Sequence, residues 1–246
     1  TLNLPLLVSV SFLGLILIAV TLKTRKKRFS FSRTLLIEAL LLLSFSAQAP
    51  WVLIALLGLM VLPQLHELIT RGRSIRVFVI HMGLSMLFLC VGWGLVSNMR
   101  TDGDLVYLGY SLVGLGLVIR MGLFPAHCWV IDYFEKASFG TALLSISPLL
   151  PIYAAVHLLL PHAPELIIML ILSLSLITAV YTAAMGTIQI EARRFISYFL
   201  LSHASLILAG LMFNSLLGMT AGLFLWLSVS LSGMTRTGIR DVTTRC

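Results

Sequence analysis

One stretch of the chain, between positions 111 and 136, combines an apolar run with residues that could handle charge inside a membrane. These residues are Arg120, Pro125, His127, Trp129 and Asp132. An arginine at the centre of a bilayer costs about 2.5 kcal/mol or more, so it faces protein or a water-filled cavity and marks an ion pair or a proton or ion pathway. Pro125 lacks the backbone donor that a helix needs and clashes with the preceding turn. We therefore predict a helix that is interrupted near residues 122–127.

Three roles for Arg120 follow from these properties. It could be structural, facing the protein interior and pairing with a carboxylate such as Glu38 or Asp132 or with backbone carbonyls. It could be a fixed positive charge that modulates the proton path of a neighbouring chain. It could also extend to the membrane interface, beside an interfacial belt formed by His127 and Trp129. For His127 and Trp129 we favour a role in holding the broken helix over a role in proton transfer.

Few other groups inside apolar segments could exchange a proton near neutral pH. They are Glu38, His81, His157 and His203. Histidine is the side chain whose ordinary pKa lies in this range, but the three histidines fall on different apolar segments with no polar residues evidently joining them. A neutral, hydrogen-bonded imidazole is the simpler interpretation of His203. Glu38 lies one turn inside its segment, where an interfacial position beside Arg33 is the simpler interpretation.

The elements that must position these residues are membrane-spanning helices. Hydrophobic residues make up 59% of the chain and charged residues only 11%, and about 20 apolar residues are enough to cross a bilayer. We predict an all-α, polytopic transmembrane bundle of eight to nine spans, forming a single transmembrane domain over residues 1–246. The predicted spans are approximately 3–22, 34–48, 50–69, 75–97, 105–124, 138–160, 164–187, 195–213 and 215–234.

Composition also excludes several classes of function. The net charge of +8 arises mainly from short loops, where it indicates topology, and no folded polar domain offers a basic face for nucleic acid. Cys90, Cys128 and Cys246 are scattered without the spacing of a metal site or a disulfide framework. We expect no metal, no catalytic residue and no cofactor in this chain.

A second motif lies downstream of the first, in the segment QIEARRFISYFLLSHASLILAGL at residues 189–211. Its notable residues are Gln189, Glu191, Arg193, Arg194, Tyr198, Ser202, His203 and Gly210. Together the two motifs resemble the antiporter-like membrane subunits of respiratory complex I, which are NADH dehydrogenase chains 2, 4 and 5, and their relatives in cation/proton antiporters and membrane-bound hydrogenases. The resemblance covers about residues 35–235, and chain 2 is the most similar member. It implies a truncated antiporter-like fold with a broken helix near Pro125.

This sequence departs from the family pattern at the proton-carrying positions. The lysine of the broken helix is Arg120 here, and arginine keeps its proton in proteins. The lysine of the following span would fall at Pro148 or Leu149, and the glutamate of an earlier span would fall between Ala55 and Gly58. These departures predict that the proton relay is lost.

The resemblance implies a membrane-arm subunit of a proton-pumping NADH:ubiquinone oxidoreductase, in a structural role. Its partners would be other membrane subunits on both lateral faces, together with lipids. We expect the loop cluster of Glu191, Arg193 and Arg194 to contact a neighbouring subunit. The membrane would be the mitochondrial inner membrane, with the bacterial cytoplasmic membrane as an alternative. Two other functions stay open: an active subunit of an antiporter or hydrogenase complex, favoured by a buried titrating lysine or glutamate, and an unrelated membrane scaffold.

Overall fold

The computed structural model describes residues 7–8, 11–12, 14–15, 31–98, 103–146 and 149–243. All regular structure in these residues is helical, as predicted. From Phe31 onward the helices are α2 (Phe31–Ser46), α3 (Pro50–Thr70), α4 (Arg76–Asn98), α5 (Gly103–Met121), α6 (Cys128–Lys136), α7 (Phe139–Ile146), α8 (Leu150–Leu158), α9 (Glu165–Thr187), α10 (Ala192–Met212) and α11 (Leu216–Thr243).

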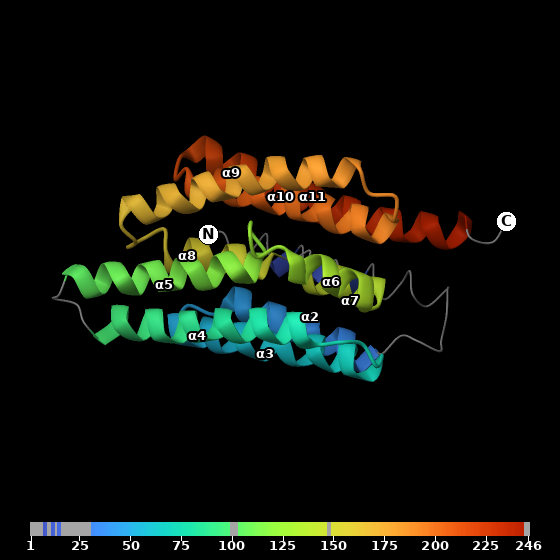
Figure 1. Ribbon diagram of the computed structural model, residues 1–246, viewed down its shortest axis with the longest axis horizontal. Helices are drawn as coiled ribbons and strands as arrows, with labels where there is room; N and C mark the ends of the chain where they lie inside the picture. The colour runs from blue at the N-terminus through green and yellow to red at the C-terminus, as the bar shows by residue number, and fades with distance from the viewer. Residues whose placement is uncertain are drawn as a thin grey trace.

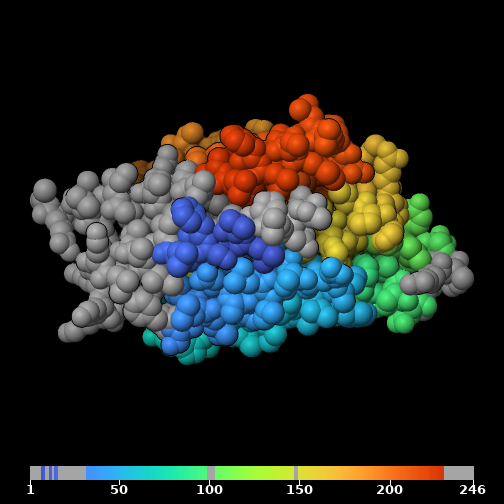
Figure 2. Space-filling view, turned by 180° about the vertical axis from the view of Figure 1, so that it is seen from behind, coloured from blue at the N-terminus to red at the C-terminus, as the bar shows by residue number. Residues whose placement is uncertain are grey.

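The helices run roughly side by side along the long axis of the molecule. In Figure 1, α9, α10 and α11 lie together on one side, α2, α3 and α4 on the other, and α5 to α8 between them. Helix α2 also contacts α11, since the rings of Phe45 and Trp226 are 6.3 Å apart, and these two helices form much of the face seen in Figure 2. The central position of α5 to α8 places the broken helix between the two outer groups.

Among the described residues, six helical segments are long and apolar enough to cross a membrane, fewer than the eight to nine predicted. They are 50–70, 76–98, 103–121, 139–158, 165–187 and 192–212. Helix α2 has only 16 residues, and of α11 only Leu216–Val229 lies among the residues from which the spans are counted. Most of the predicted span 3–22 lies outside the described residues. The lower number of spans therefore holds for the described residues.

The segment predicted as a single span over 138–160 consists of two shorter helices, α7 and α8. Leu149, which precedes α8, has a φ of 50°, in the left-handed region, and Pro151 lies in the first turn of α8. Proline is tolerated there because the first N–H groups of a helix have no intrahelical acceptor. The chain therefore changes direction beside Leu149, close to the broken helix.

Small residues allow α4 and α5 to pack very closely. A Cβ atom on Gly92 would lie 2.8 Å from the carbonyl oxygen of Gly109, and the Ser85 hydroxyl donates a 2.8 Å hydrogen bond to the Gly116 carbonyl. Such contacts are typical of helix association in lipid. These close contacts fix α5 against α4.

Candidate functional site

The helix that carries Arg120 ends at a glycine. Gly122 has a φ of 72°, its N–H donates to the Ile119 carbonyl at 3.1 Å, and the Leu123 N–H donates to the Val118 carbonyl at 3.0 Å. This pair of bonds is the Schellman arrangement that closes a helix on a residue in the left-handed conformation. Pro125 follows, and α6 begins only at Cys128. The predicted interruption near residues 122–127 is confirmed.

Aromatic residues join the two sides of the break. The Trp129 indole N–H donates a 2.8 Å hydrogen bond to the Ile119 carbonyl, so α6 binds the last turn of α5 directly. The His127 ring lies 5.2 Å from the Tyr181 ring and 6.0 Å from the Phe124 ring. His127 and Trp129 are both buried. Their contacts are those of residues that hold the break in place.

Arg120 is enclosed by protein, with 4% of its surface exposed. Its Nη2 donates a 2.5 Å hydrogen bond to the Leu57 carbonyl. The alternative of an ion pair with Glu38 or Asp132 is wrong, because Arg120 forms an ion pair with no described carboxylate and Asp132 pairs with Lys136 at 2.6 Å. The expected interior position with a backbone carbonyl as partner is confirmed. Asp132 and Lys136 lie one turn apart on α6, beyond the break, where their pairing needs no tertiary contact. The interior position also argues against an interfacial Arg120.

Arg120 lines a cavity of about 50 Å³. Other lining residues come from α3, α7, the start of α8 and α10, among them Leu57, Gln64, Ser145, Leu149 and Ser205. Leu57 lies in the segment where the resemblance leads us to expect a glutamate, and Leu149 is one of the two positions, with Pro148, where it leads us to expect a lysine. The structure thus brings these three positions together, and only Arg120 carries a charge.

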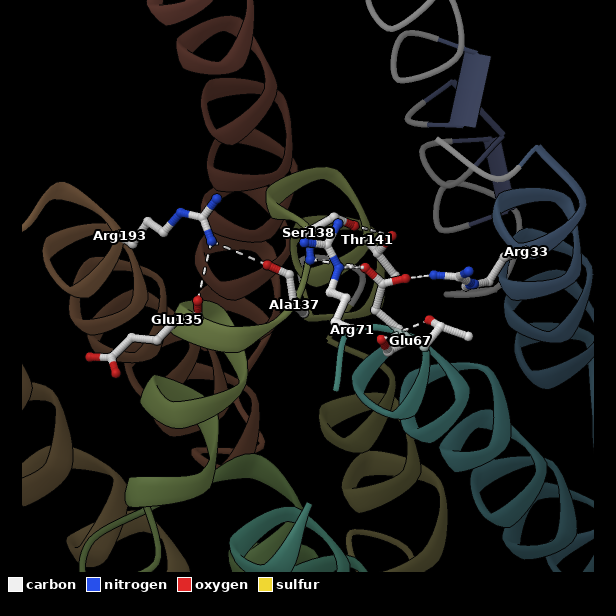
Figure 3. A network of polar contacts seen from close by, with 9 residues as sticks. Arg33, Glu67, Arg71, Glu135, Ala137, Ser138, Thr141 and Arg193 are labelled. Atoms are coloured by element: carbon white, nitrogen blue, oxygen red, sulfur yellow. Dashed lines mark hydrogen bonds and ion pairs between the residues drawn. The ribbon is translucent and has the colours of Figure 1, made fainter. Parts of the chain in front are cut away.

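A second polar centre surrounds Glu67, at the end of α3 (Figure 3). Its carboxylate forms ion pairs with Arg33 of α2 and with Arg71, whose Nε lies 2.5 Å from Oε1. The same oxygen accepts a 3.0 Å hydrogen bond from the Ser138 N–H, just before α7. The Ser138 hydroxyl in turn donates to Thr141 at 2.7 Å. One carboxylate, 2% exposed, therefore links three helices.

Sequence reasoning missed Glu67 and assigned it to the polar end of a span. A buried glutamate therefore lies inside the predicted span 50–69. A local signal was present, since glutamate four residues before Arg71 predicts an ion pair along a helix. The pairing with Arg33, on another helix, has no such signal. Arg33 was expected to lie beside Glu38, but it pairs with Glu67 instead. The Glu38 carboxylate lies against Gly14.

The basic residues at the start of α10 hold the end of α6. Arg193 Nη1 donates to the carbonyls of Glu135 and Ala137, both at 3.2 Å (Figure 3). Arg194 pairs with the Glu135 carboxylate and lies 3.5 Å from that of Glu191. The two arginines were expected to contact a neighbouring subunit, but they make these contacts within the chain. Glu191 is the most exposed member of the cluster, with 68% of its side chain accessible.

The histidines proposed as proton carriers are bound to backbone carbonyls. The distances from ring nitrogen to oxygen are 2.8 Å for His81 with Val77, 2.9 Å for His157 with Gln48 and 2.8 Å for His203 with Phe199. In the part of the chain that the structure describes, no hydrogen bond joins any two of these histidines or connects one to Glu38. The same residues contain no cluster of three metal-ligating side chains.

Comparison with known proteins places these features in a family. Residues 75–235 match the family "NADH:quinone oxidoreductase/Mrp antiporter, TM". Subunit N of NADH-quinone oxidoreductase from Mycobacterium tuberculosis is 24% identical over 140 residues, which are 55% of this chain and 26% of the relative. NADH-ubiquinone oxidoreductase chain 4 from Candida albicans is 23% identical over 192 residues, which are 71% of this chain and 41% of the relative. The chain therefore spans less than half the length of these relatives.

Solved structures share the fold over nearly the whole chain. The Mrp complex from Dietzia sp. DQ12-45-1b matches 99% of this chain and 30% of its own, with a TM-score of 0.86 and 15% identity. Respiratory complex I from Thermus thermophilus matches 97% of this chain and 55% of its own, with a TM-score of 0.79 and 22% identity. The family match excludes an unrelated membrane scaffold. The chain belongs to the NADH:quinone oxidoreductase/Mrp antiporter membrane family.

Proposed function

We propose that this chain is a membrane-arm subunit of a proton-pumping NADH:quinone oxidoreductase, in which it has a structural role and no proton relay of its own. One observation carries the proposal. The charged residue of the broken helix is Arg120, and it donates to the backbone carbonyl of Leu57, in the segment where the resembled family has a glutamate.

The chemistry of arginine supports the loss of the relay. A relay needs groups that gain and lose a proton near physiological pH, whereas arginine stays protonated in proteins. None of the six candidate spans contains a lysine, and the cavity beside Arg120 offers Leu149 at the next relay position. A positive charge fixed at this position can stabilise the break and bias a neighbour, but it cannot pass a proton onward.

Apolar side chains on opposite sides of the molecule support partners on both lateral faces. Helices α4 and α9 lie on different sides of the central group (Figure 1), and both expose large apolar residues. Examples are Val79, Ile80 and Leu87 on α4 and Leu166, Leu170 and Val180 on α9. In a bilayer such surfaces meet lipid or other membrane subunits. We assign the chain to the mitochondrial inner membrane, with the bacterial cytoplasmic membrane as the alternative, since its relatives come from both a yeast and bacteria.

A second candidate function has one observation in its favour. Glu67 is a buried carboxylate inside a candidate span, which an active subunit of a cation/proton antiporter or membrane-bound hydrogenase would need. Its negative charge, however, is balanced by Arg33 and Arg71. A carboxylate held between two arginines and a backbone N–H favours a structural link over a mobile proton.

Co-purification tests the proposal. The tagged chain is extracted in mild detergent, and the captured complex is identified by mass spectrometry and assayed for NADH:quinone oxidoreduction. We expect other subunits of that oxidoreductase together with its activity. Arg120→Met should reduce capture of the complex, while the exposed control Arg73→Met should not. A tagged chain that purifies only with antiporter or hydrogenase subunits would contradict the proposal, and normal assembly of Arg120→Met with weaker proton transfer would assign Arg120 an electrostatic role.

A further inference from the structure

The side-chain amide of Gln64 has no partner inside the protein. Gln64 lies on α3 and is only 5% exposed, yet no hydrogen bond of its amide occurs among the described residues. An amide both donates and accepts hydrogen bonds, and burying it without a partner is unfavourable. Gln64 lines the cavity of about 50 Å³, and its amide atoms are not sealed off by the surrounding protein. This side chain therefore indicates a ligand that forms hydrogen bonds inside the cavity.

The other polar side chains of the cavity wall are sealed off or already bound. The Nη1 nitrogen of Arg120 and the hydroxyl of Ser145 are closed off by the surrounding protein, and Nη2 of Arg120 binds a backbone carbonyl. The Ser205 hydroxyl donates to the Leu201 carbonyl at 2.8 Å. The amide of Gln64 is uncharged, so it suits a neutral ligand.

The remainder of the cavity wall consists of apolar side chains. They include Met60, Leu123, Val130, Ile146 and Leu200. A pocket with an apolar wall and few polar groups binds the body of a ligand through its apolar surface and fixes its orientation through the polar groups. The ligand should therefore have an apolar body and a single hydrogen-bonding group.

The size of the cavity decides between such a molecule and water. A water molecule needs about 10–15 Å³ of this volume, so the cavity has room for about three to five waters or a similar number of non-hydrogen atoms. Each buried water needs about 2–4 polar partners, which the single amide of Gln64 cannot supply to the whole group. A molecule with one polar group fills the same volume and leaves no such deficit.

We propose that the cavity is a binding site for one short-chain alcohol. Its hydroxyl lies against the amide of Gln64, and its carbon chain lies against the apolar wall. The site goes beyond the proposed function, because it does not depend on the complex in which the chain resides.

Binding can be measured through Trp129, whose side chain also lines the cavity. The probe is 2-bromoethanol, a molecule of the required size whose bromine quenches indole fluorescence on contact. In the full chain in nanodiscs, the difference in fluorescence between wild type and Trp129→Phe isolates Trp129. We expect its quenching to saturate at millimolar concentrations, because so small a ligand makes few contacts.

The role of the amide is tested by a pair of variants and a second probe. Gln64→Leu should weaken binding of 2-bromoethanol about tenfold, because it removes the hydrogen bond to the hydroxyl. Bromoethane, which lacks the hydroxyl, should bind to Gln64→Leu no more weakly than to wild type. The matched control is Gln48→Leu, at an exposed position, and it should bind both probes as wild type does.

Each contrary result overturns the proposal. Quenching of Trp129 that rises without saturation would mean that the probe acts from the bilayer and that the cavity holds no alcohol. Equal weakening of both probes in Gln64→Leu, or of neither, would show that the amide does not bind the hydroxyl. If Gln64→Leu does not fold, Ala204→Leu decides the question, since it fills the cavity from α10 and keeps Gln64. Unchanged saturable quenching in Ala204→Leu would then place the alcohol elsewhere on the protein.

Discussion

The carboxylate of Glu67 accepts a 3.0 Å hydrogen bond from the backbone N–H of Ser138, 71 residues further along the chain. This bond joins the end of α3 to the start of α7 and lies beside the ion pairs of Glu67 with Arg33 and Arg71. An acidic group before a helix also complements the positive end of that helix. The contact fixes the outer group α2–α3 to the central helices and so helps to shape the cavity at Arg120.

Glu67→Gln should lower the free energy of unfolding by about 3 kcal/mol, because it removes one partner of a buried ion pair. Arg33 and Arg71 then lack the negative charge that balances them. The amide keeps the shape of the side chain, so the loss reports on charge. Unfolding in detergent, followed by circular dichroism during titration with sodium dodecyl sulfate, measures the change. Glu165→Gln, at an exposed position of α9, is the control and should remain near wild type. Equal stability of the two variants would contradict the role given to Glu67.

Gly92→Ala should destabilise the protein by about 1–3 kcal/mol, the usual cost of overpacking. Its Cβ atom would lie 2.8 Å from the Gly109 carbonyl oxygen and 2.8 Å from the Val113 nitrogen, and backbone atoms cannot move aside as a flexible side chain can. Gly83→Ala, on the same helix, is the control, because a Cβ there meets nothing within 4 Å. It should be neutral or slightly stabilising, since alanine favours a helix. The same titration compares the two, and a stable Gly92→Ala protein would show that α4 and α5 pack less closely than described.

Trp129→Phe should cost about 1–2 kcal/mol, because phenylalanine keeps the aromatic packing but loses the hydrogen bond from the indole N–H to Ile119. We also expect faster proteolysis at the break between α5 and α6. Trp51→Phe provides the matched control, since Trp51 is 48% exposed and no hydrogen bond of its indole occurs among the described residues. Identical cleavage of Trp129→Phe and wild type would mean that Trp129 does not hold the break.

Arg193→Gln should lower the free energy of unfolding more than Arg194→Gln does, although the two residues are neighbours. Arg193 binds two backbone carbonyls at the end of α6, and the bond to Ala137 is partly shielded from water, so its loss should cost more than the loss of an exposed ion pair. Arg194 makes ion pairs with 47% of its side chain exposed, and exposed pairs of this kind contribute little to stability. High salt should reduce the small loss of stability caused by Arg194→Gln, and it should leave the loss caused by Arg193→Gln unchanged. Equal effects with equal salt dependence would contradict this assignment.

Much of the helical framework could be predicted from the sequence, because long apolar runs bounded by charges or proline determine where helices cross. The predicted span 164–187 is helix Glu165–Thr187, and the predicted span 50–69 is helix Pro50–Thr70. A proline inside an apolar run did not predict whether the helix is interrupted there. Pro63 lies within a continuous α3, whereas a break separates α7 from α8 before Pro151. Neighbouring helices decide whether the freed carbonyl finds a donor, and the sequence does not contain that information.

The polar centres were harder to predict, since they depend on residues far apart in the chain. The family pattern identified Arg120 and the break, but its partner is a backbone carbonyl, which every residue possesses. Glu67 was assigned to a helix end because its partner Arg33 lies on another helix. The contacts of Arg193 with α6 were missed for the same reason. Local rules find pairs one turn apart, such as Asp132 with Lys136, and tertiary structure supplies the rest.

The central claim is that no proton passes through the histidines of this chain. The most direct test is the proton-to-electron ratio of the assembled oxidoreductase in liposomes, measured for wild type and for the combined variant His81→Phe, His157→Leu, His203→Leu. Each histidine binds a backbone carbonyl on its own, so we predict the same ratio for both complexes at equal rates of NADH oxidation. A clearly lower ratio in an intact variant complex would contradict the account and show that these histidines carry protons.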